Sequence, residues 1–231
     1  MKLIFIDVDN TLLDFDEYVK TTMKNGFDYF NLIPYEPYMY DIFTTINNDL
    51  WRKIETRELT FDELQKIRWN LIFEKLKINF DGVTFEKYFR KELNESAIPV
   101  PGSYTLLENL HKQYILCAAS NGPYNQQIHR LNLADMTKYF DYFFISEKIG
   151  VSKPHKSFFS IALNEVNSDR DNKITPADCM ILGDSLTSDI AGGKNFGMTT
   201  CLYRRDKSTN IDSTACDIII DNLTDLIDLI N

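Results

Sequence analysis

The sequence lacks an apolar run that approaches the roughly 18 residues needed to cross a membrane. It also lacks, at its start, the basic segment followed by an apolar segment that is typical of a secretory signal. We therefore expect a cytoplasmic protein that has no membrane partner. Its 231 residues are enough for one large domain, or for a core domain with a smaller insert.

Cysteine is scarce, and the four cysteines form no C-x-x-C pair. They are Cys117, Cys179, Cys201 and Cys216. Three of them lie in apolar runs that look like strands, which is typical of buried thiols in a reducing compartment. The sequence therefore favours free cysteines over disulfides or a zinc site.

Positive charge is also in short supply, because the formal net charge is −9. A surface that binds a nucleic-acid polymer usually needs a basic patch, so we expect no such partner. A small anionic substrate is still possible, because a bound metal ion can supply local positive charge. The sequence does not indicate how many copies of the chain assemble.

Two common motifs for binding cations and phosphates are absent. A calcium-binding EF-hand loop that began at Asp7 would need glycine and glutamate where Leu12 and Tyr18 stand. The stretch Gly192-Gly193-Lys194 lacks the earlier glycine and the following Ser or Thr of a P-loop. Any phosphate chemistry must therefore use another set of residues.

Short apolar runs alternate with helical patterns from about residue 100 onward. The expected strands are 2–6, 114–119, 142–145, 179–182, 199–203 and 217–220. The expected helices between and after them are 104–111, 124–133, 157–166, 187–196 and 223–230. Buried strands that alternate with helices indicate a parallel sheet covered on both faces. The predicted fold class is α/β, with a doubly wound parallel sheet.

Residues 15–98 show helical patterns and no convincing strand. Thr60 opens a capping box with Glu63, and Thr84 is a candidate cap for the next helix. The first of these helices should bury one apolar face, made of Leu64, Ile67, Leu71 and Ile72. We expect a catalytic core formed by residues 1–14 and 99–231, with 15–98 inserted as a helical cap.

The strand at 2–6 leads into two carboxylates on alternate residues, Asp7 and Asp9. Alternate residues of a strand point to the same side, so this pair should repel unless a cation or a proton separates their roles. Polar clusters also follow later strands, at Ser120-Asn121, Lys153-Pro154, Asp184 and Asp189. The carboxyl ends of parallel strands share one edge of the sheet, so we expect these side chains to meet there.

This set of residues suits phosphoryl transfer. Asp7 would attack phosphorus and form an aspartyl-phosphate, while Asp9 would act first as acid and then as base. Mg²⁺, held by Asp7, Asp184 and a backbone carbonyl, would screen the carboxylates from the phosphate. Ser120 and Lys153 would hold phosphoryl oxygens in the transition state.

The four motifs, taken in order, resemble those of the haloacid dehalogenase-like hydrolases. They are DVDNT at 7–11, Ser120-Asn121, Lys153-Pro154 and GDSLTSD at 183–189. The resemblance implies that Asp7 is the nucleophile and Asp9 the acid/base, with the Asp9 carbonyl on Mg²⁺. It also implies that Ser120, Asn121 and Lys153 bind phosphate, that Asp184 binds the metal, and that Asp189 supports it.

The insert is similar to the first cap type of this family. The runs at 145–159 and 183–198 look most like the branch that contains house-cleaning pyrimidine 5′-nucleotidases. The resemblance therefore implies a small phosphorylated metabolite as substrate, with a nucleoside monophosphate favoured. The insert holds 17 of the 30 aromatic residues, among them Trp51 and Trp69. Such rings could stack on a nucleobase, but they could equally fill the core of a helical bundle.

Several other functions remain open. A phosphosugar phosphatase or mutase of the same family is the nearest, whereas a dehalogenase would have no use for an acid/base at Asp9. A serine esterase with Ser185 as nucleophile would normally need a later histidine, but His111, His129 and His155 all precede it. A non-enzymatic binding module is disfavoured, because the metal-binding and proton-transfer residues are all present.

Overall fold

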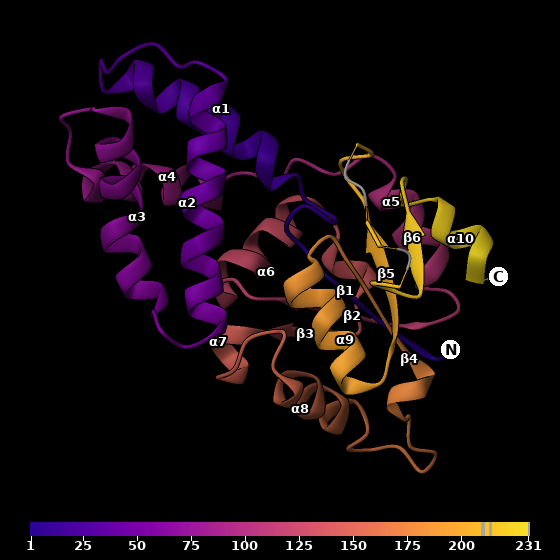
Figure 1. The fold of residues 1–231 in the computed structure, drawn as a ribbon. Helices are drawn as coiled ribbons and strands as arrows, with labels where there is room; N and C mark the ends of the chain where they lie inside the picture. Colours follow the sequence, from indigo (N-terminus) through magenta and orange to yellow (C-terminus); the bar gives the residue numbers. More distant parts are fainter. Residues whose placement is uncertain (209–210, 213, 231) are drawn as a thin grey trace. The chain divides into compact units, whose positions relative to one another are not determined.

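A computed structural model describes residues 1–208, 211–212 and 214–230 of the chain. The chain forms two compact units (Figure 1). The first unit comprises Met1–Asp14 and Ala97–Asn231, and the second comprises Phe15–Ser96. We call the first the core unit and the second the helical unit.

The core unit contains a six-stranded sheet in which every neighbouring pair of strands is parallel. The strands are β1 (Leu3–Ile6), β2 (Ile115–Ser120), β3 (Tyr142–Ile145), β4 (Cys179–Gly183), β5 (Thr199–Tyr203) and β6 (Ile218–Ile220). Their order is β3-β2-β1-β4-β5-β6, so the chain builds outward from β1 first on one side and then on the other. This confirms the doubly wound α/β fold.

Helices cover both faces of this sheet (Figure 1). They are α5 (Ser103–Leu110), α6 (Tyr124–Leu133), α7 (Ser146–Ile149), α8 (Lys156–Val166), α9 (Ala191–Phe196) and α10 (Asp225–Ile230). Ile4 and Ile6 of β1 pack into one apolar cluster that contains Leu106 of α5. Phe5 points the other way, into a cluster with Phe159 of α8. A strand buried on both faces is therefore apolar throughout, as β1 is.

The helical unit consists of α1 (Phe15–Tyr29), α2 (Tyr38–Glu55), α3 (Phe61–Leu76) and α4 (Gly82–Asn94). Helix α3 begins at the expected capping box of Thr60 and Glu63. The expectation for α4 was wrong, because this helix is capped by Asp81 and not by Thr84. The Asp81 carboxylate accepts hydrogen bonds from the backbone N–H groups of Val83 and Thr84, and so satisfies donors at the helix start.

The inward face of α3 also differs from the expected apolar stripe. Leu71 is exposed, and Arg68 is buried on the inward face instead. The Arg68 guanidinium forms two hydrogen bonds with the Glu86 carboxylate, at 3.0 and 2.6 Å, and a third with Asn47 Oδ1 at 2.9 Å. Because each nitrogen of this guanidinium has a hydrogen-bond partner, the helix can bury the cation in place of an apolar residue.

Trp69 is fully buried in the aromatic core of the helical unit. Its ring centroid lies 4.3 Å from that of Phe85 and 5.2 Å from that of Phe89. Trp51, in contrast, is half-buried and contacts Phe61 with a centroid distance of 5.8 Å. The structure therefore assigns Trp69 to packing.

None of the helices in the described part of the chain has both the length and the apolar character that a membrane span requires.

We predict that Trp69→Ala lowers the free energy of unfolding by roughly 3–5 kcal/mol, because it leaves a cavity among packed rings. The matched variant Trp51→Ala removes the same side chain from a half-buried position and should cost clearly less. Urea unfolding followed by far-UV circular dichroism measures both. Equal losses would mean that the two rings contribute alike to the core.

Candidate active site

The carboxyl ends of three adjacent strands bring the predicted site residues to one edge of the sheet. In the register, Ile6 of β1 lies opposite Ala118 of β2 and Leu182 of β4. Asp7 directly follows β1, and Asp184 directly follows β4. This edge, beside the point where the strand order reverses, is where ligands bind in open α/β sheets.

Lys153 reaches this edge from the loop between α7 and α8 and is 1 % exposed. Its Nζ donates to Asp7 Oδ1 at 2.7 Å, to Asp189 Oδ1 at 2.7 Å and to the carbonyl oxygen of Ala119 at 2.6 Å. Burial acts to lower the pKa of Lys153, but the ion pairs with Asp189 and Asp7 outweigh it and raise the pKa. The ammonium group therefore stays charged.

Asp7 is also buried, but here burial favours the neutral, protonated form. Burial raises the pKa of Asp7 to about 7; Lys153 acts against this rise, and the neighbouring carboxylate of Asp189 adds to it. Its Oδ2 accepts a hydrogen bond from Thr11 Oγ1 at 3.3 Å. One lysine thus faces two buried carboxylates, and the pocket carries more negative charge than the protein itself neutralises.

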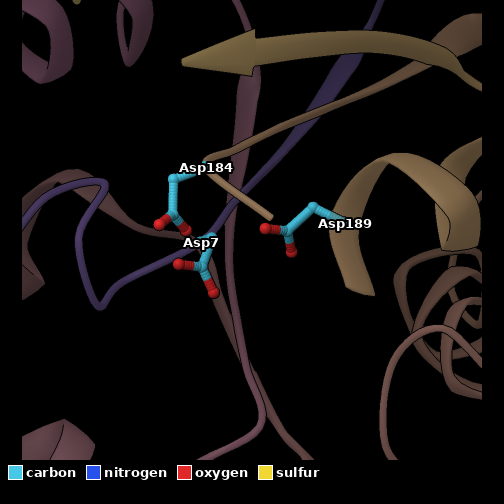
Figure 2. A group of neighbouring side chains, drawn as sticks. All are labelled: Asp7, Asp184 and Asp189. Carbon is cyan, nitrogen blue, oxygen red and sulfur yellow. The ribbon is translucent and has the colours of Figure 1, made fainter. Parts of the chain in front are cut away.

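Asp184 completes an acidic cluster with Asp7 and Asp189. Each residue offers one oxygen, and these three atoms lie within 4.8 Å of one another. Figure 2 shows the three carboxylates turned toward the same space, with Asp189 coming from a helical turn. Hard carboxylate oxygens are the ligands that Mg²⁺ prefers, and a divalent cation would neutralise the excess charge. The residues therefore fit a magnesium site.

Within this cluster, Asp189 is already engaged by protein groups. Its Oδ1 accepts from Lys153, and its Oδ2 accepts from the backbone N–H of Ser185 at 3.1 Å. The approach depends on Gly183, where an added Cβ would lie 2.2 Å from Asp189 Oδ2. Oδ2 of Asp7, in contrast, has only a longer bond of 3.3 Å to Thr11 among the described residues. We therefore expect Asp7 and Asp184 to hold the metal directly, with Asp189 in support.

The segment after β4 differs from the single helix expected at 187–196. A π-helical turn, Leu186–Ile190, comes first, and α9 follows it. The hydroxyl of Ser185 accepts a hydrogen bond from the Ser188 N–H at 3.1 Å and so caps this turn. The wide turn places Asp189 inward, where it is 1 % exposed. Capping of this turn therefore accounts for Ser185, without the nucleophilic role that a serine esterase would give it.

Asn121 uses its side chain on the protein as well. Its Oδ1 accepts from the Lys153 N–H, and its Nδ2 donates to the Lys153 carbonyl, both at 2.9 Å. Nδ2 also lies 3.3 Å from Ser188 Oγ. This amide fixes the loop that carries Lys153, while phosphate binding by Asn121 stays a prediction.

Two further residues of the site were not predicted from the sequence, Gln127 and Arg130 on α6. Arg130 donates to Asp9 Oδ1 at 2.5 Å, and Gln127 Nε2 donates to Asp9 Oδ2 at 2.6 Å. Gln127 Nε2 also donates to Ser120 Oγ at 2.8 Å. The sequence did indicate that these two polar residues face inward, because they fall on the same helical face as Leu131, a face that must pack on the sheet.

A family model described as haloacid dehalogenase-like hydrolase matches residues 1–197. The HAD-hydrolase YfnB of Bacillus subtilis is 30% identical over 230 residues, which cover 100% of this chain and 95% of that protein. A crystal structure of YfnB bound to magnesium superimposes with a TM-score of 0.87 and covers 100% of this chain and 98% of that one.

Two other relatives differ in the activity their names give. The pyrimidine 5′-nucleotidase YjjG of Escherichia coli is 30% identical, and the match covers 86% of this chain and 84% of that protein. The glyceraldehyde 3-phosphate phosphatase of Pyrococcus furiosus is 27% identical, with 100% of this chain and 93% of that protein covered. Both similarities extend over most of the chain. The two named activities share the hydrolysis of a phosphorylated substrate and differ in which substrate is hydrolysed.

The raised pKa of Asp7 predicts a pH-dependent response to Mg²⁺. Folding raises this pKa from 3.8 to about 7, so the bound proton stabilises the metal-free protein at low pH and is lost as the pH rises through 7. Mg²⁺ needs the deprotonated carboxylate, so it should raise the melting temperature more at about pH 8 than at about pH 5.

Differential scanning fluorimetry at both pH values, with and without Mg²⁺, checks this expectation. The control is Asp135→Asn, which removes an exposed carboxylate elsewhere in the core unit and should respond as the wild type does. Asp7→Asn should lose most of the response. A magnesium-induced shift of equal size at both pH values would contradict the prediction.

Proposed function

The chain belongs to the haloacid dehalogenase-like hydrolases, and on that premise we propose that it is a magnesium-dependent phosphomonoesterase that acts through an aspartyl-phosphate. The observation that carries this proposal is the Asp7 carboxylate, held by Lys153 at 2.7 Å and adjacent to Asp184 in an acidic cluster. A fixed carboxylate beside a cation site is the arrangement that a carboxylate nucleophile requires.

Each residue has a role in two successive displacements. Asp7 attacks phosphorus, and the bond to the leaving oxygen breaks as Asp9 donates a proton to that oxygen. Asp9 then accepts a proton from the water that attacks the phosphorus of the aspartyl-phosphate. The bond between phosphorus and the Asp7 oxygen breaks, which releases phosphate and restores the Asp7 carboxylate. Ser120 and Lys153 hold the phosphoryl oxygens on which negative charge spreads. Asp7, Asp184 and the Asp9 carbonyl would hold Mg²⁺, which would supply the positive charge that lets a phosphate approach these carboxylates.

The proposed substrates are nucleoside monophosphates, which would make the enzyme a 5′-nucleotidase. The similarity to YjjG supports this choice, and the similarity to the triose-phosphate phosphatase of Pyrococcus furiosus supports a sugar or triose phosphate as the second candidate. The site residues of the core unit address only the phosphoryl group and the metal, which all these substrates share. We therefore assign the choice among them to the helical unit, Phe15–Ser96.

The proposed function is tested by measuring phosphate release from a panel of phosphomonoesters. The purified protein is assayed with Mg²⁺ or with EDTA on pyrimidine and purine monophosphates, on triose and pentose phosphates, and on p-nitrophenyl phosphate. We expect magnesium-dependent release, with the highest kcat/KM on a pyrimidine monophosphate. A preference for a triose or pentose phosphate would favour the second candidate, and no release from any ester would overturn the proposal.

Asp7→Asn should abolish turnover without unfolding the protein. An amide has nearly the shape of the carboxylate but is a poor nucleophile and a poor metal ligand. Phosphate release from p-nitrophenyl phosphate should fall to background, while circular dichroism shows an intact fold. The exposed-site variant Asp135→Asn should keep full activity. An Asp7→Asn protein that retains a near-wild-type rate with Mg²⁺ would show that the nucleophile is a different residue.

Asp9→Asn should slow both displacements, because one residue serves first as acid and then as base. The loss of general acid–base catalysis should reduce kcat on an alkyl phosphate by about a hundredfold or more. Steady-state phosphate release measures this effect. An unchanged rate would assign the proton transfers to another group.

A further inference from the structure

Helix α6 sends two polar side chains to the carboxylate of Asp9. Arg130 binds one oxygen of this carboxylate and Gln127 binds the other. The two side chains also bond to each other, since Arg130 donates to Gln127 Oε1 at 3.1 Å. Both oxygens of Asp9 are thus held from one helix, which fixes where the carboxylate lies and how its plane is turned.

Stability alone does not account for these two residues. Gln127 and Arg130 are each 1 % exposed, and burying such groups is costly unless they are fully bonded. Replacing a buried ion pair by apolar residues of similar size is often neutral or stabilising. Leu131, a neighbour on the same face of α6, packs into the apolar cluster of the sheet, so this face does accommodate an apolar side chain. The Asp9 side chain is 32 % exposed, so water could solvate it without α6.

A glycine makes room for the Gln127 amide. A Cβ at Gly122 would lie 2.5 Å from Gln127 Nε2 and 3.0 Å from its Cγ. The N–H of Gly122 also donates to Ser120 Oγ at 3.2 Å. The glycine of the Ser120-Asn121-Gly122 stretch therefore does more than form a turn, because it lets Gln127 approach Ser120 and Asp9 at the same time.

We propose that Gln127 and Arg130 are positioning residues that hold Asp9 in register with the phosphate-binding hydroxyl of Ser120. This inference rests on the proposed function, in which the proton of Asp9 passes to the leaving oxygen as the P–O bond breaks. Gln127 Nε2 bridges Asp9 and Ser120, so the proton donor and the phosphoryl group keep a fixed relation. Such alignment determines the efficiency of proton transfer.

The leaving group distinguishes positioning from a general structural effect. An alkyl phosphate needs its leaving oxygen to be protonated, whereas a 2,4-dinitrophenolate leaves without help. Arg130→Met and Gln127→Met should therefore reduce kcat/KM on an alkyl phosphate by about 10- to 100-fold and on 2,4-dinitrophenyl phosphate by less than about threefold. The ratio kcat/KM is the right measure, because it reports the steps up to release of the leaving group.

Matched variants control for the loss of an arginine. Arg204→Met breaks another Arg–Asp pair of the core unit, with Asp221, and should change neither substrate. Arg130→Lys keeps the positive charge and should recover part of the alkyl phosphate activity. If Arg130→Met fails to fold, Gln127→Met and Gly122→Ala still test how Asp9 is held, because both disturb the bond from Gln127 to Asp9. They should show the same dependence on the leaving group.

A double variant tests whether Arg130 acts through Asp9. Adding Arg130→Met to Asp9→Asn should cost little more on the alkyl phosphate than Asp9→Asn alone, because the positioned group is already lost. Losses that multiply, or equal losses on both leaving groups, would overturn the inference while the proposed function stands. A wild-type protein that hydrolyses no phosphomonoester would overturn both.

Discussion

The whole site depends on one ammonium group held between two buried carboxylates. Lys153 bonds to Asp7 and Asp189, and without it these two carboxylates would face each other in a region that water barely reaches. Removing one partner of a buried ion pair leaves an uncompensated charge, which is strongly destabilising. The Asn121 side chain holds both backbone groups of Lys153, so β2 also fixes where this cation lies.

In the proposed function, the excess negative charge of the site would have to be offset by a bound cation before a phosphate could enter. Lys153 neutralises one of its two partners, and Asp184 adds a further carboxylate to the cluster. A phosphate dianion would meet repulsion here unless a metal ion arrived first or together with it. Under the proposed function, metal binding and substrate binding would therefore be coupled by charge. YfnB, a relative whose crystal structure contains magnesium, has the same fold over the whole chain.

The fold was largely predictable from the sequence because apolar runs determine buried strands. The expected strands at 142–145 and 199–203 coincide with β3 and β5, and the expected helix at 124–133 coincides with α6. The side chains that fill the site from α6 were not predicted, because burial of an arginine depends on a partner distant in the sequence. The spacing of Gln127, Arg130 and Leu131 indicates that the arginine faces the sheet, but Arg130 and Asp9 are 121 positions apart, so local patterns do not identify its partner. For the same reason the sequence predicted Leu71, and not Arg68, on the inward face of α3, because burial of Arg68 also depends on a partner, Glu86, on another helix.

The buried pair of Arg68 and Glu86 bears on how the helical unit keeps a single packing arrangement. Its core is rich in aromatic rings, whose contacts alone do not require one exact alignment of the helices. Arg68 lies over the rings of Phe43 and Phe89, 5.9 and 4.8 Å from their centroids, and ends on Glu86. A shift of α3 by one turn along α4 would leave both charges among phenyl rings without a partner. The pair therefore favours a single alignment of α3 on α4, which aromatic packing alone would specify less strictly.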